Sequence, residues 1–233
     1  MLFHSSLHLL IGKSYNTMVS KALEEKFDYH MNDTTSDMHE HFTLLRSIGL
    51  NCDVVVELGV RNIVSTWAFL MGLASSESRL IGNTDSNQLT MTSMKKLISY
   101  DITHPKKFDA DIEEVYDIAK ENEVSFEFHE ADTLKVELPL CNAIFFDTDH
   151  TYIQLSQELE LHGNKADRYL IFHDTMQRAT ELIPAINEFL EKNKEWLILR
   201  VDNYCHGLTV LARTTKEQVI AQTLAWEESK PKS

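Results

Sequence analysis

Short apolar runs alternate with longer amphipathic segments along most of the chain. A run such as residues 143–146, which is apolar without alternation, predicts a strand buried on both faces of a sheet. The predicted strands lie near 54–57, 97–101, 124–128, 143–146 and 169–173, and the predicted helices near 65–74, 109–121, 152–163 and 179–193. This alternation indicates a mostly parallel sheet with helices on both faces.

The two ends of the chain depart from this alternation. Helices near 15–30 and 37–47 precede the first strand, with Ser36 or Asp37 as a cap and Gly49 as a stop. Strands near 196–201 and 208–212 flank a turn too short for a helix, so they predict an antiparallel hairpin. We expect an α/β fold: a Rossmann-like three-layer sandwich with a mostly parallel seven-stranded sheet, an antiparallel C-terminal hairpin and N-terminal helices. We place an N-terminal helical extension or lid at 1–48, the main domain at 49–226 and a flexible tail at 227–233.

The segment 75–96 fits this scheme less well than its neighbours. Residues 79–85 could form a strand ending in Asp85, in competition with the strand that ends in Asp101. The regular spacing from Asp101 to the next helix and strand favours Asp101 as the end of the second strand, with 75–96 as an insertion before it. The choice between Asp85 and Asp101 stays open at this point.

Composition narrows the classes of function. The 233 residues are 43% hydrophobic, enough for one sizeable core, and the net charge of -14 argues against nucleic acid or an anionic membrane as a partner. Only 7 residues are glycine, and no G-x-G-x-x-G or G-K-[ST] loop occurs, so a dinucleotide or nucleoside triphosphate is not expected. The 3 scattered cysteines indicate a reducing compartment, and no apolar run could span a bilayer. We expect a cytoplasmic protein (in the host cytoplasm if the source is viral), compatible with a homo-oligomer.

Acids and histidines follow two of the predicted core strands. Asp147, Asp149 and His150 come after the strand at 143–146, and His173 and Asp174 end the next strand. Carboxyl ends of parallel strands meet at one edge of the sheet, where ligands bind. Carboxylates and imidazoles gathered there would repel and desolvate one another unless a divalent cation or proton transfer uses them. The pattern indicates an enzyme.

Five segments, in order, resemble motifs of class I S-adenosylmethionine (SAM)-dependent methyltransferases, with the macrocin-type sugar O-methyltransferases and cephalosporin-hydroxylase-like proteins as the most similar group. They are VELGVRNIVST (56–66), YDI (100–102), AD (131–132), FDTDHTY (146–152) and FHDT (172–175). Each motif is weak alone, but their order and spacing across residues 36–213 make the resemblance specific. It implies a SAM-dependent enzyme.

The resemblance implies a cofactor site in the first half of the domain. Asp101 would accept hydrogen bonds from the ribose hydroxyls, Gly59 would let the backbone approach the ligand, and Asp132 would face the adenine amino group. Glu57 would add negative charge near the sulfonium, and Arg61, Ser65 and Thr66 complete the implied cofactor set. One departure stands out: Ile63 occupies a position where family members often have a second glycine.

The resemblance also implies a metal site and a general base. Asp147 and Asp174 would ligate magnesium or manganese, and His150 would remove the proton from the acceptor hydroxyl. His173 stands where the family commonly has a third carboxylate ligand. Either His173 only flanks the site, with Asp149 or water filling in, or the metal preference shifts towards manganese or iron.

We therefore expect a metal-assisted SAM-dependent O-methyltransferase that acts on a hydroxyl of a sugar, a glycan or another small polyol. His41, Asp149 and His206 are candidate substrate contacts. The alternatives are a metal-independent small-molecule methyltransferase, a metallohydrolase built on the acid-and-histidine set, and a non-catalytic SAM-binding module. The sequence does not name the acceptor.

Overall fold

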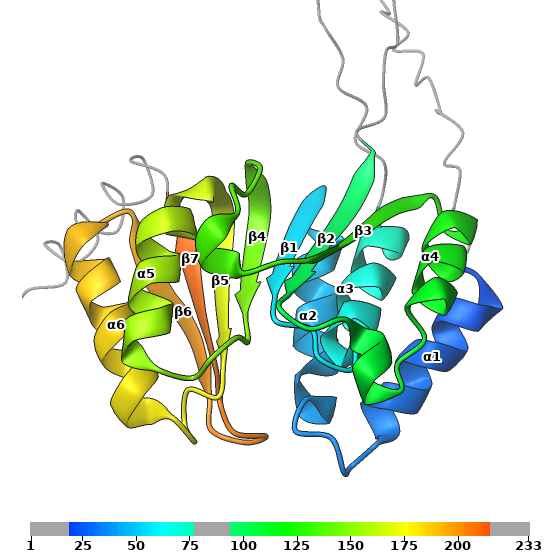
Figure 1. The fold of residues 1–233 in the computed structure, drawn as a ribbon, viewed down its shortest axis with the longest axis horizontal. Coiled ribbons are helices and arrows are strands. Elements are labelled where there is room, and N and C mark those ends of the chain that lie inside the picture. The colour runs from blue at the N-terminus through cyan, green and yellow to red at the C-terminus, as the bar shows by residue number, and fades with distance from the viewer. Residues whose placement is uncertain (1–18, 77–93, 215–233) are drawn as a thin grey trace, which may run out of the picture.

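A seven-stranded sheet runs through the centre of the protein, in the strand order β3-β2-β1-β4-β5-β7-β6 (Figure 1). The computed structural model describes residues 19–76 and 94–214. The strands are β1 (Val54–Leu58), β2 (Lys95–Asp101), β3 (Val124–Glu130), β4 (Cys141–Phe146), β5 (Ala166–His173), β6 (Trp196–Asp202) and β7 (Leu208–Arg213). The first five are parallel, whereas β7 pairs antiparallel with both β5 and β6. The predicted mostly parallel sheet and its C-terminal hairpin are confirmed.

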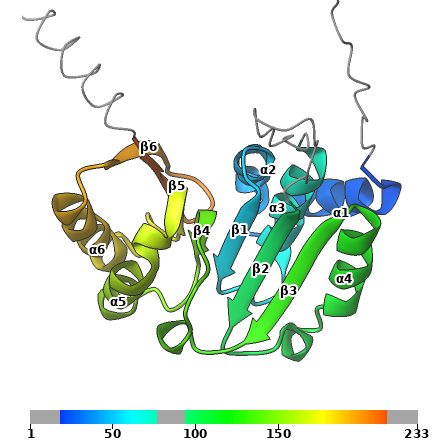
Figure 2. The same ribbon diagram turned by 90° about the horizontal axis from the view of Figure 1, so that it is seen from above.

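Helices cover both faces of the sheet and complete the predicted three-layer sandwich (Figure 2). They are α1 (Lys21–Asn32), α2 (Phe42–Leu50), α3 (Val64–Ser75), α4 (Ile112–Glu121), α5 (Tyr152–His162) and α6 (Ala179–Lys192). Helices α1 to α4 share one hydrophobic cluster with β1, whereas α5 and α6 pack on the opposite face. Short 3₁₀ turns, η1 (His39–His41), η2 (Pro105–Phe108), η3 (Thr133–Lys135) and η4 (Gly163–Lys165), connect the larger elements.

The two N-terminal helices belong to the core of this face. Leu23 of α1 and Leu45 of α2 are fully buried in the same cluster as β1 and α3. Gly49, which we predicted to end the second helix, lies inside α2, which ends at Leu50 with Asn51 as its C-cap. A Cβ at Gly49 would lie 2.9 Å from the Phe69 carbonyl oxygen of α3, so glycine is needed here for close helix packing. The domain boundary at 48/49 stays a prediction.

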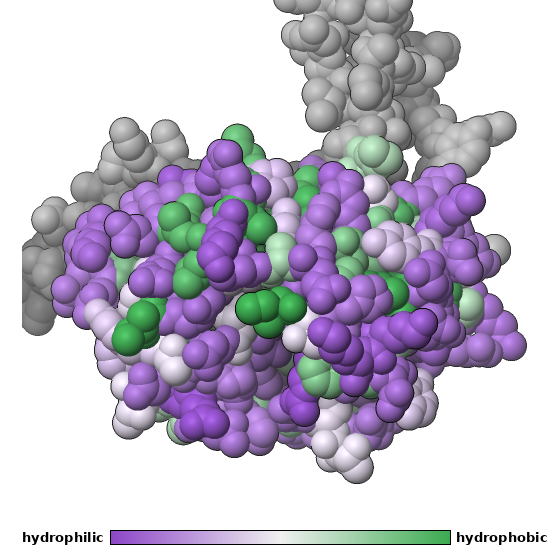
Figure 3. Space-filling model, in the orientation of Figure 1, coloured by the Kyte–Doolittle hydropathy of each residue, from purple (hydrophilic) through white to green (hydrophobic). Residues whose placement is uncertain are grey.

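Strand pairing with β1 shows which segment forms the second strand. The strand that ends in Asp101 lies beside β1 in parallel register, as preferred from the sequence. The alternative residue Asp85 lies outside the described residues. Among the described residues, no helix has both the length and the apolar character required to cross a membrane. On the face shown in Figure 3, hydrophobic residues are scattered among hydrophilic ones.

Candidate active site

Strand register brings the polar strand ends together at one edge of the sheet. Leu58 of β1 pairs with Phe146 of β4, and Phe146 pairs with Phe172 of β5. The next residues, Gly59, Asp147 and His173, therefore lie side by side. The Asp147 N–H donates to the Leu58 carbonyl at 2.8 Å, which extends the pairing by one residue.

A cavity of about 920 Å³ opens above this edge. One wall carries five of the seven predicted cofactor residues and the other the acids and histidines. The lining residues that matter most below are Gly59, Asp101, Asp132, Asp147, His150 and Asp174. The volume lies near the upper end of the range for small-molecule sites, roughly 300–1,000 Å³. One cavity thus joins the two halves of the predicted site.

Asp101 fixes the loop that follows β1. Its Oδ2 accepts from the backbone N–H groups of Val60 at 2.9 Å and Arg61 at 2.8 Å, and its Oδ1 accepts from Thr103 at 2.8 Å. Gly59 has a φ of +85°, and a Cβ there would overlap the Asp147 carbonyl group. The loop can take this path only with glycine at this position, because an L side chain would be strained and would also clash.

Ile63 occupies a backbone conformation that normally favours glycine. Its φ of 59° and ψ of 27° lie in the left-handed region, and its side chain is buried. A β-branched residue rarely adopts this conformation. The position where the resembling family often has a second glycine therefore keeps a glycine-like backbone in this protein.

Glu57 lies beneath the cavity and holds three elements together. Its buried carboxylate accepts from the hydroxyls of Ser65 at 2.8 Å, Thr66 at 2.9 Å and Ser99 at 2.7 Å, which joins β1 to α3 and β2. Burial raises the pKa of Glu57 to about 7 against the opposing effect of these hydroxyls. Ser65 lines the cavity, but Glu57 and Thr66 are not among its lining residues. Direct contact of the latter two with a cofactor stays a prediction.

Asp132 and Arg61 stand on the cofactor wall of the cavity. Asp132 caps η3 by accepting from the Leu134 N–H at 3.0 Å, and its other oxygen pairs with Lys135 at 2.7 Å. The Lys135 ammonium lowers the pKa of Asp132. A carboxylate held in this way can still accept a hydrogen bond from an amino group in the cavity.

The acids and histidines after β4 and β5 form one cluster of ion pairs. His150 Nε2 lies 2.8 Å from Asp174 Oδ2 and 3.2 Å from Asp147 Oδ1. His173 Nδ1 lies 3.3 Å from Asp147 Oδ1 and 3.4 Å from Asp174 Oδ2. Asp174 itself has a φ of 58°, which turns the chain sharply after β5. The convergence predicted from the strand ends is present.

His173 is an imidazolium in this arrangement. Its Nδ1 faces the carboxylates of Asp147 and Asp174, and its Nε2 faces the carbonyl oxygens of Asp37 at 3.2 Å and Cys205 at 3.1 Å. All four partners are acceptors, so both ring nitrogens must donate. Burial lowers the pKa of His173, but the hydrogen bonds to the two carboxylates outweigh it and raise the pKa to about 11.

The same two carboxylates favour the protonated form of His150. Its hydrogen bonds to Asp147 and Asp174 raise the pKa of the imidazole to about 9, against the effect of burial. Burial opposes the ionisation of Asp147 and Asp174, but the hydrogen bonds from the two histidines lower the pKa of both carboxyls. Each of the two imidazole rings therefore lies within ion-pair distance of both carboxylates.

Asp147, His173 and Asp174 could together hold a metal ion. Each offers one ligand atom, and these atoms lie within 4.8 Å of one another. The His173 ring is oriented by backbone carbonyls on its far nitrogen, which is the usual outer-shell support of a metal-binding imidazole. Two carboxylate oxygens and one nitrogen suit manganese or iron better than magnesium. The donor set fits a divalent cation once the Nδ1 proton is released.

The predicted substrate residues lie at different depths. Asp149 lines the cavity, and its Oδ2 accepts from the Thr151 hydroxyl at 3.3 Å. His206 is exposed, and its Nδ1 lies 3.2 Å from Asp174 Oδ1. His41 is fully buried, with Nε2 3.2 Å from the Cys205 carbonyl oxygen and its ring stacked on Tyr204. His41 therefore supports the β6–β7 turn from beneath.

The structure brings Asp37, which was not among the predicted site residues, to the cluster. It lines the cavity, its carboxylate lies 3.3 Å from His206 Nδ1, and its carbonyl oxygen faces His173. The sequence of residues 37–41 allowed both a capped, solvated helix start and a binding role, because nothing in its local pattern indicates a contact with a residue 136 positions away. Its place in an acid-and-histidine segment, DMHEH, was the available signal.

No protein-family profile and no curated protein sequence matches the chain. Solved structures do match over most of its length. The S-adenosylhomocysteine (SAH)-bound methyltransferase PaMTH1 from Podospora anserina is 13% identical, with 84% of this chain and 89% of that chain covered and a TM-score of 0.51. A methyltransferase from Geobacter sulfurreducens is 13% identical over 84% and 90%, with a TM-score of 0.53. The O-methyltransferase TomG from Streptomyces achromogenes, in complex with SAM, is 11% identical over 84% and 91%, with a TM-score of 0.50.

These similarities define the class of fold. The protein has the Rossmann-like fold of SAM-dependent methyltransferases, with the seven strands in the order described above. At 11–13% identity the likeness concerns the fold, and the function rests on the site.

Proposed function

We propose that the protein is a SAM-dependent O-methyltransferase. The observation that carries this proposal is the single cavity in which the loop held by Asp101 faces the cluster of Asp147, His150, His173 and Asp174. The cavity lies at the carboxyl edge of the parallel sheet, where ligands of open α/β sheets bind. The similar PaMTH1 and TomG structures contain SAH and SAM, respectively.

The cofactor would occupy the wall formed by the ends of β1, β2 and β3. Asp101 retains one lone pair, on Oδ1, for a ribose hydroxyl, since each carboxylate oxygen offers two lone pairs and three of the four accept from the loop. Gly59 and Arg61 would approach the ligand through their backbone, and Asp132 would receive the adenine amino group. Glu57, Ser65 and Thr66 would act by fixing this loop. When bound, SAM supplies an electrophilic methyl group on a sulfonium.

The reaction half would deprotonate and position the acceptor. The hydroxyl oxygen forms a bond to the methyl carbon as the carbon–sulfur bond breaks, and its proton passes to Nε2 of His150. The products are a methyl ether and S-adenosylhomocysteine. His150 can take this role only when its own proton is released, because its ion pairs with Asp147 and Asp174 raise its pKa to about 9.

A divalent cation would be held by Asp147, His173 and Asp174, where it would lower the pKa of the acceptor hydroxyl. It would also neutralise the negative charge of the two carboxylates, and so lower the pKa of His150. Manganese or iron fits this ligand set best, with magnesium the expectation from the resemblance. Asp147 and Asp174, which pair with the rings of His150 and His173, would then bind a divalent ion in place of a singly charged imidazolium.

The acceptor would be a polyhydroxylated small molecule or glycan. Polar side chains of Asp33, Thr35, Ser36, Asp37 and Asp149 line the cavity, and they supply acceptors and hydroxyl groups for hydrogen bonds with sugar hydroxyls. Macromolecular acceptors that need a basic surface, such as nucleic acid, are not proposed, because the chain carries a net charge of -14.

A metal-independent methyltransferase is the second candidate. The observation that favours it is the position of His173 Nδ1, 3.3 Å from Asp147 Oδ1 and 3.4 Å from Asp174 Oδ2, where a protonated ring would pair with both carboxylates. In that case the imidazolium pair has a structural role, and the acceptor must have a more acidic hydroxyl, such as a phenol.

Calorimetry with SAM and with SAH tests the cofactor assignment, on the wild type, on Asp101→Ala and on the control Asp117→Ala, which changes an exposed acid of α4. We expect micromolar binding by the wild type and the control and a loss of at least tenfold in Asp101→Ala. No binding of either ligand by the wild type would refute the proposal. Turnover that survives thorough chelation and is not raised by added Mn²⁺ would select the metal-independent form.

A further inference from the structure

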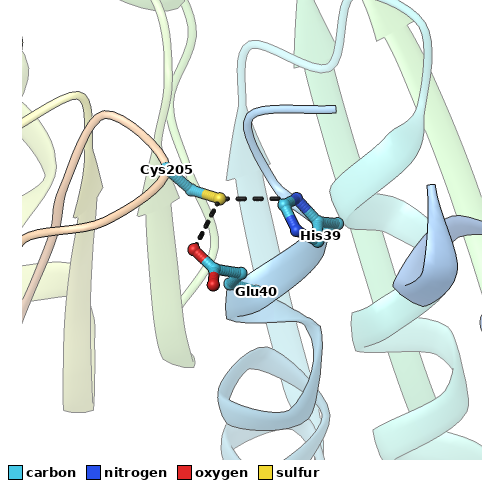
Figure 4. A group of neighbouring side chains, drawn as sticks. All are labelled: His39, Glu40 and Cys205. Carbon is cyan, nitrogen blue, oxygen red and sulfur yellow. Dashed lines mark hydrogen bonds between the residues drawn. The ribbon is translucent and has the colours of Figure 1, made fainter. Parts of the chain in front are cut away.

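A second group of metal-ligating side chains lies outside the cluster described above. Cys205 Sγ lies 3.4 Å from His39 Nδ1 and 3.2 Å from Glu40 Oε2, and the three ligand atoms lie within 4.8 Å of one another (Figure 4). Cys205 and His39 are part buried, and Glu40 is exposed. A thiol, an imidazole and a carboxylate thus converge at a place that solvent and ions can reach.

The three residues come from distant parts of the chain. His39 and Glu40 belong to η1, whereas Cys205 lies in the turn between β6 and β7, 166 positions after His39. Figure 4 shows the two side chains of η1 pointing toward the sulfur from across the gap between the segments. The fold therefore brings the cluster together, and no cysteine-spacing motif in the sequence predicts it.

The distances match those of a tetrahedral metal site. Zinc–sulfur bonds are about 2.3 Å and zinc–nitrogen or zinc–oxygen bonds about 2.0–2.2 Å, so two ligands at the tetrahedral angle lie about 3.6 Å apart. The observed separations from Cys205 Sγ are 3.4 Å to His39 and 3.2 Å to Glu40. The two separations from Cys205 Sγ need to grow by only a few tenths of an ångström to admit the ion, and all three ligand atoms already lie within 4.8 Å of one another.

We propose that His39, Glu40 and Cys205 bind a thiophilic divalent cation, with Zn²⁺ as the best fit and a water molecule as the fourth ligand. Thiolate and imidazole together select zinc over magnesium or calcium, which prefer oxygen. This site shares no residue with the proposed catalytic metal site, which is formed by Asp147, His173 and Asp174 and contains no sulfur.

Binding exchanges existing hydrogen bonds for metal bonds. The Cys205 thiol donates to Glu40, so its proton is released as the sulfur–metal bond forms. His39 Nδ1 also lies 2.7 Å from the Ser36 carbonyl oxygen, and this contact is lost when Nδ1 becomes a ligand, with the ring proton then on Nε2. Affinity should consequently rise with pH, as metal replaces protons on its ligands.

The site would also brace the catalytic cluster. The carbonyl oxygen of Cys205 lies 3.1 Å from His173 Nε2 and 3.2 Å from His41 Nε2. A metal on the Cys205 sulfur would hold this turn against η1 and so keep the carbonyl in place for both rings. The metal would thereby act as a structural clamp between the N-terminal segment and the β6–β7 turn.

Titration of the metal-free full-length protein with Co²⁺ tests this proposal, since a cobalt–thiolate bond gives a charge-transfer absorption band that oxygen and nitrogen ligands do not. We expect the band of the wild type to saturate at one Co²⁺ per protein molecule and to disappear when Zn²⁺ displaces the Co²⁺. The band should vanish in Cys205→Ser and weaken in His39→Gln and Glu40→Gln. It should persist in Asp147→Asn, which changes only the other cluster.

Two results would overturn the proposal. One is the absence of a thiolate band in the wild type at a moderate excess of Co²⁺. The other is a band that remains in Cys205→Ser, which would assign it to Cys52 or Cys141. Both of these thiols are buried, and burial raises the pKa of each to about 12, so they are poor competitors. Neither result depends on SAM binding or turnover, so the test is independent of the proposed function.

Discussion

The α-carbon of Gly59 packs against the peptide group of Asp147, so that no side chain fits between the two residues. This contact joins the loop after β1 to the first acid of the reaction cluster. It follows from the register of β1 and β4, in which Leu58 and Phe146 are direct partners. The cofactor half and the reaction half of the proposed site therefore share one backbone contact.

Substitution of this glycine should damage both halves. In Gly59→Ala the new Cβ overlaps the Asp147 carbonyl, and the φ of +85° is strained for alanine, so we expect a loss of at least about 1–2 kcal/mol in stability. SAM binding should fall below detection in calorimetry. A variant with wild-type stability and SAM affinity would show that the loop adapts and that the contact is unimportant.

Glu57 should make stability depend on pH. Its folded-state pKa of about 7 lies above the ordinary value of 4.5, so the folded protein holds the proton more tightly than the unfolded chain. The contribution of Glu57 to the free energy of unfolding is fully present below about pH 4.5 and is lost as the pH rises to about 7. The total is about 3 kcal/mol.

Glu57→Gln, which mimics the neutral acid, should remove most of this pH-dependent decrease in stability. Urea unfolding at pH 5 and pH 8 measures the difference, with Glu191→Gln on the exposed side of α6 as the control. We expect the decline in the free energy of unfolding to be smaller in Glu57→Gln than in the wild type and in the control. Equal declines in all three proteins would mean that Glu57 is ionised throughout this range.

Ile63 offers a direct measure of backbone strain in the cofactor loop. Both Ile63→Ala and Ile63→Gly lose the buried side chain and should be less stable than the wild type. Because the φ is 59°, glycine should be more stable than alanine here by about 1 kcal/mol, the reverse of the usual order. Thermal unfolding of the two variants checks this, and an alanine variant as stable as the glycine variant would contradict the left-handed conformation.

His150 should affect methyl transfer without affecting cofactor binding. In His150→Gln the acceptor proton has no base, so we expect kcat to fall by roughly 10²–10⁴-fold while the Kd for SAM is unchanged. Turnover with a sugar or phenol acceptor and calorimetry measure the two quantities. His129→Gln, at an exposed position on β3, is the matched control and should retain full activity. An equally active His150→Gln would remove this residue from the mechanism.

Much of the fold could be predicted because its signals are local. The apolar runs of β4 and β5 and the short turn before β7 each determine one element, and the alternation of elements determines a parallel sheet. Gly49 shows where local signals fail. A glycine near a helix end predicts a stop, but here it serves the contact between α2 and α3, which the sequence does not display.

The sequence by itself determined which residues stand at the carboxyl ends of the strands, and hence that Asp101, Asp147, His150, His173 and Asp174 share one edge. The tertiary structure decided how they are used. It paired His150 and His173 with the same two carboxylates, gave Glu57 a place beneath the cavity, and brought Cys205 to His39 and Glu40. The physical reason is range: strand ends follow from neighbours along the chain, whereas protonation, burial and ligand geometry follow from contacts between residues far apart in it.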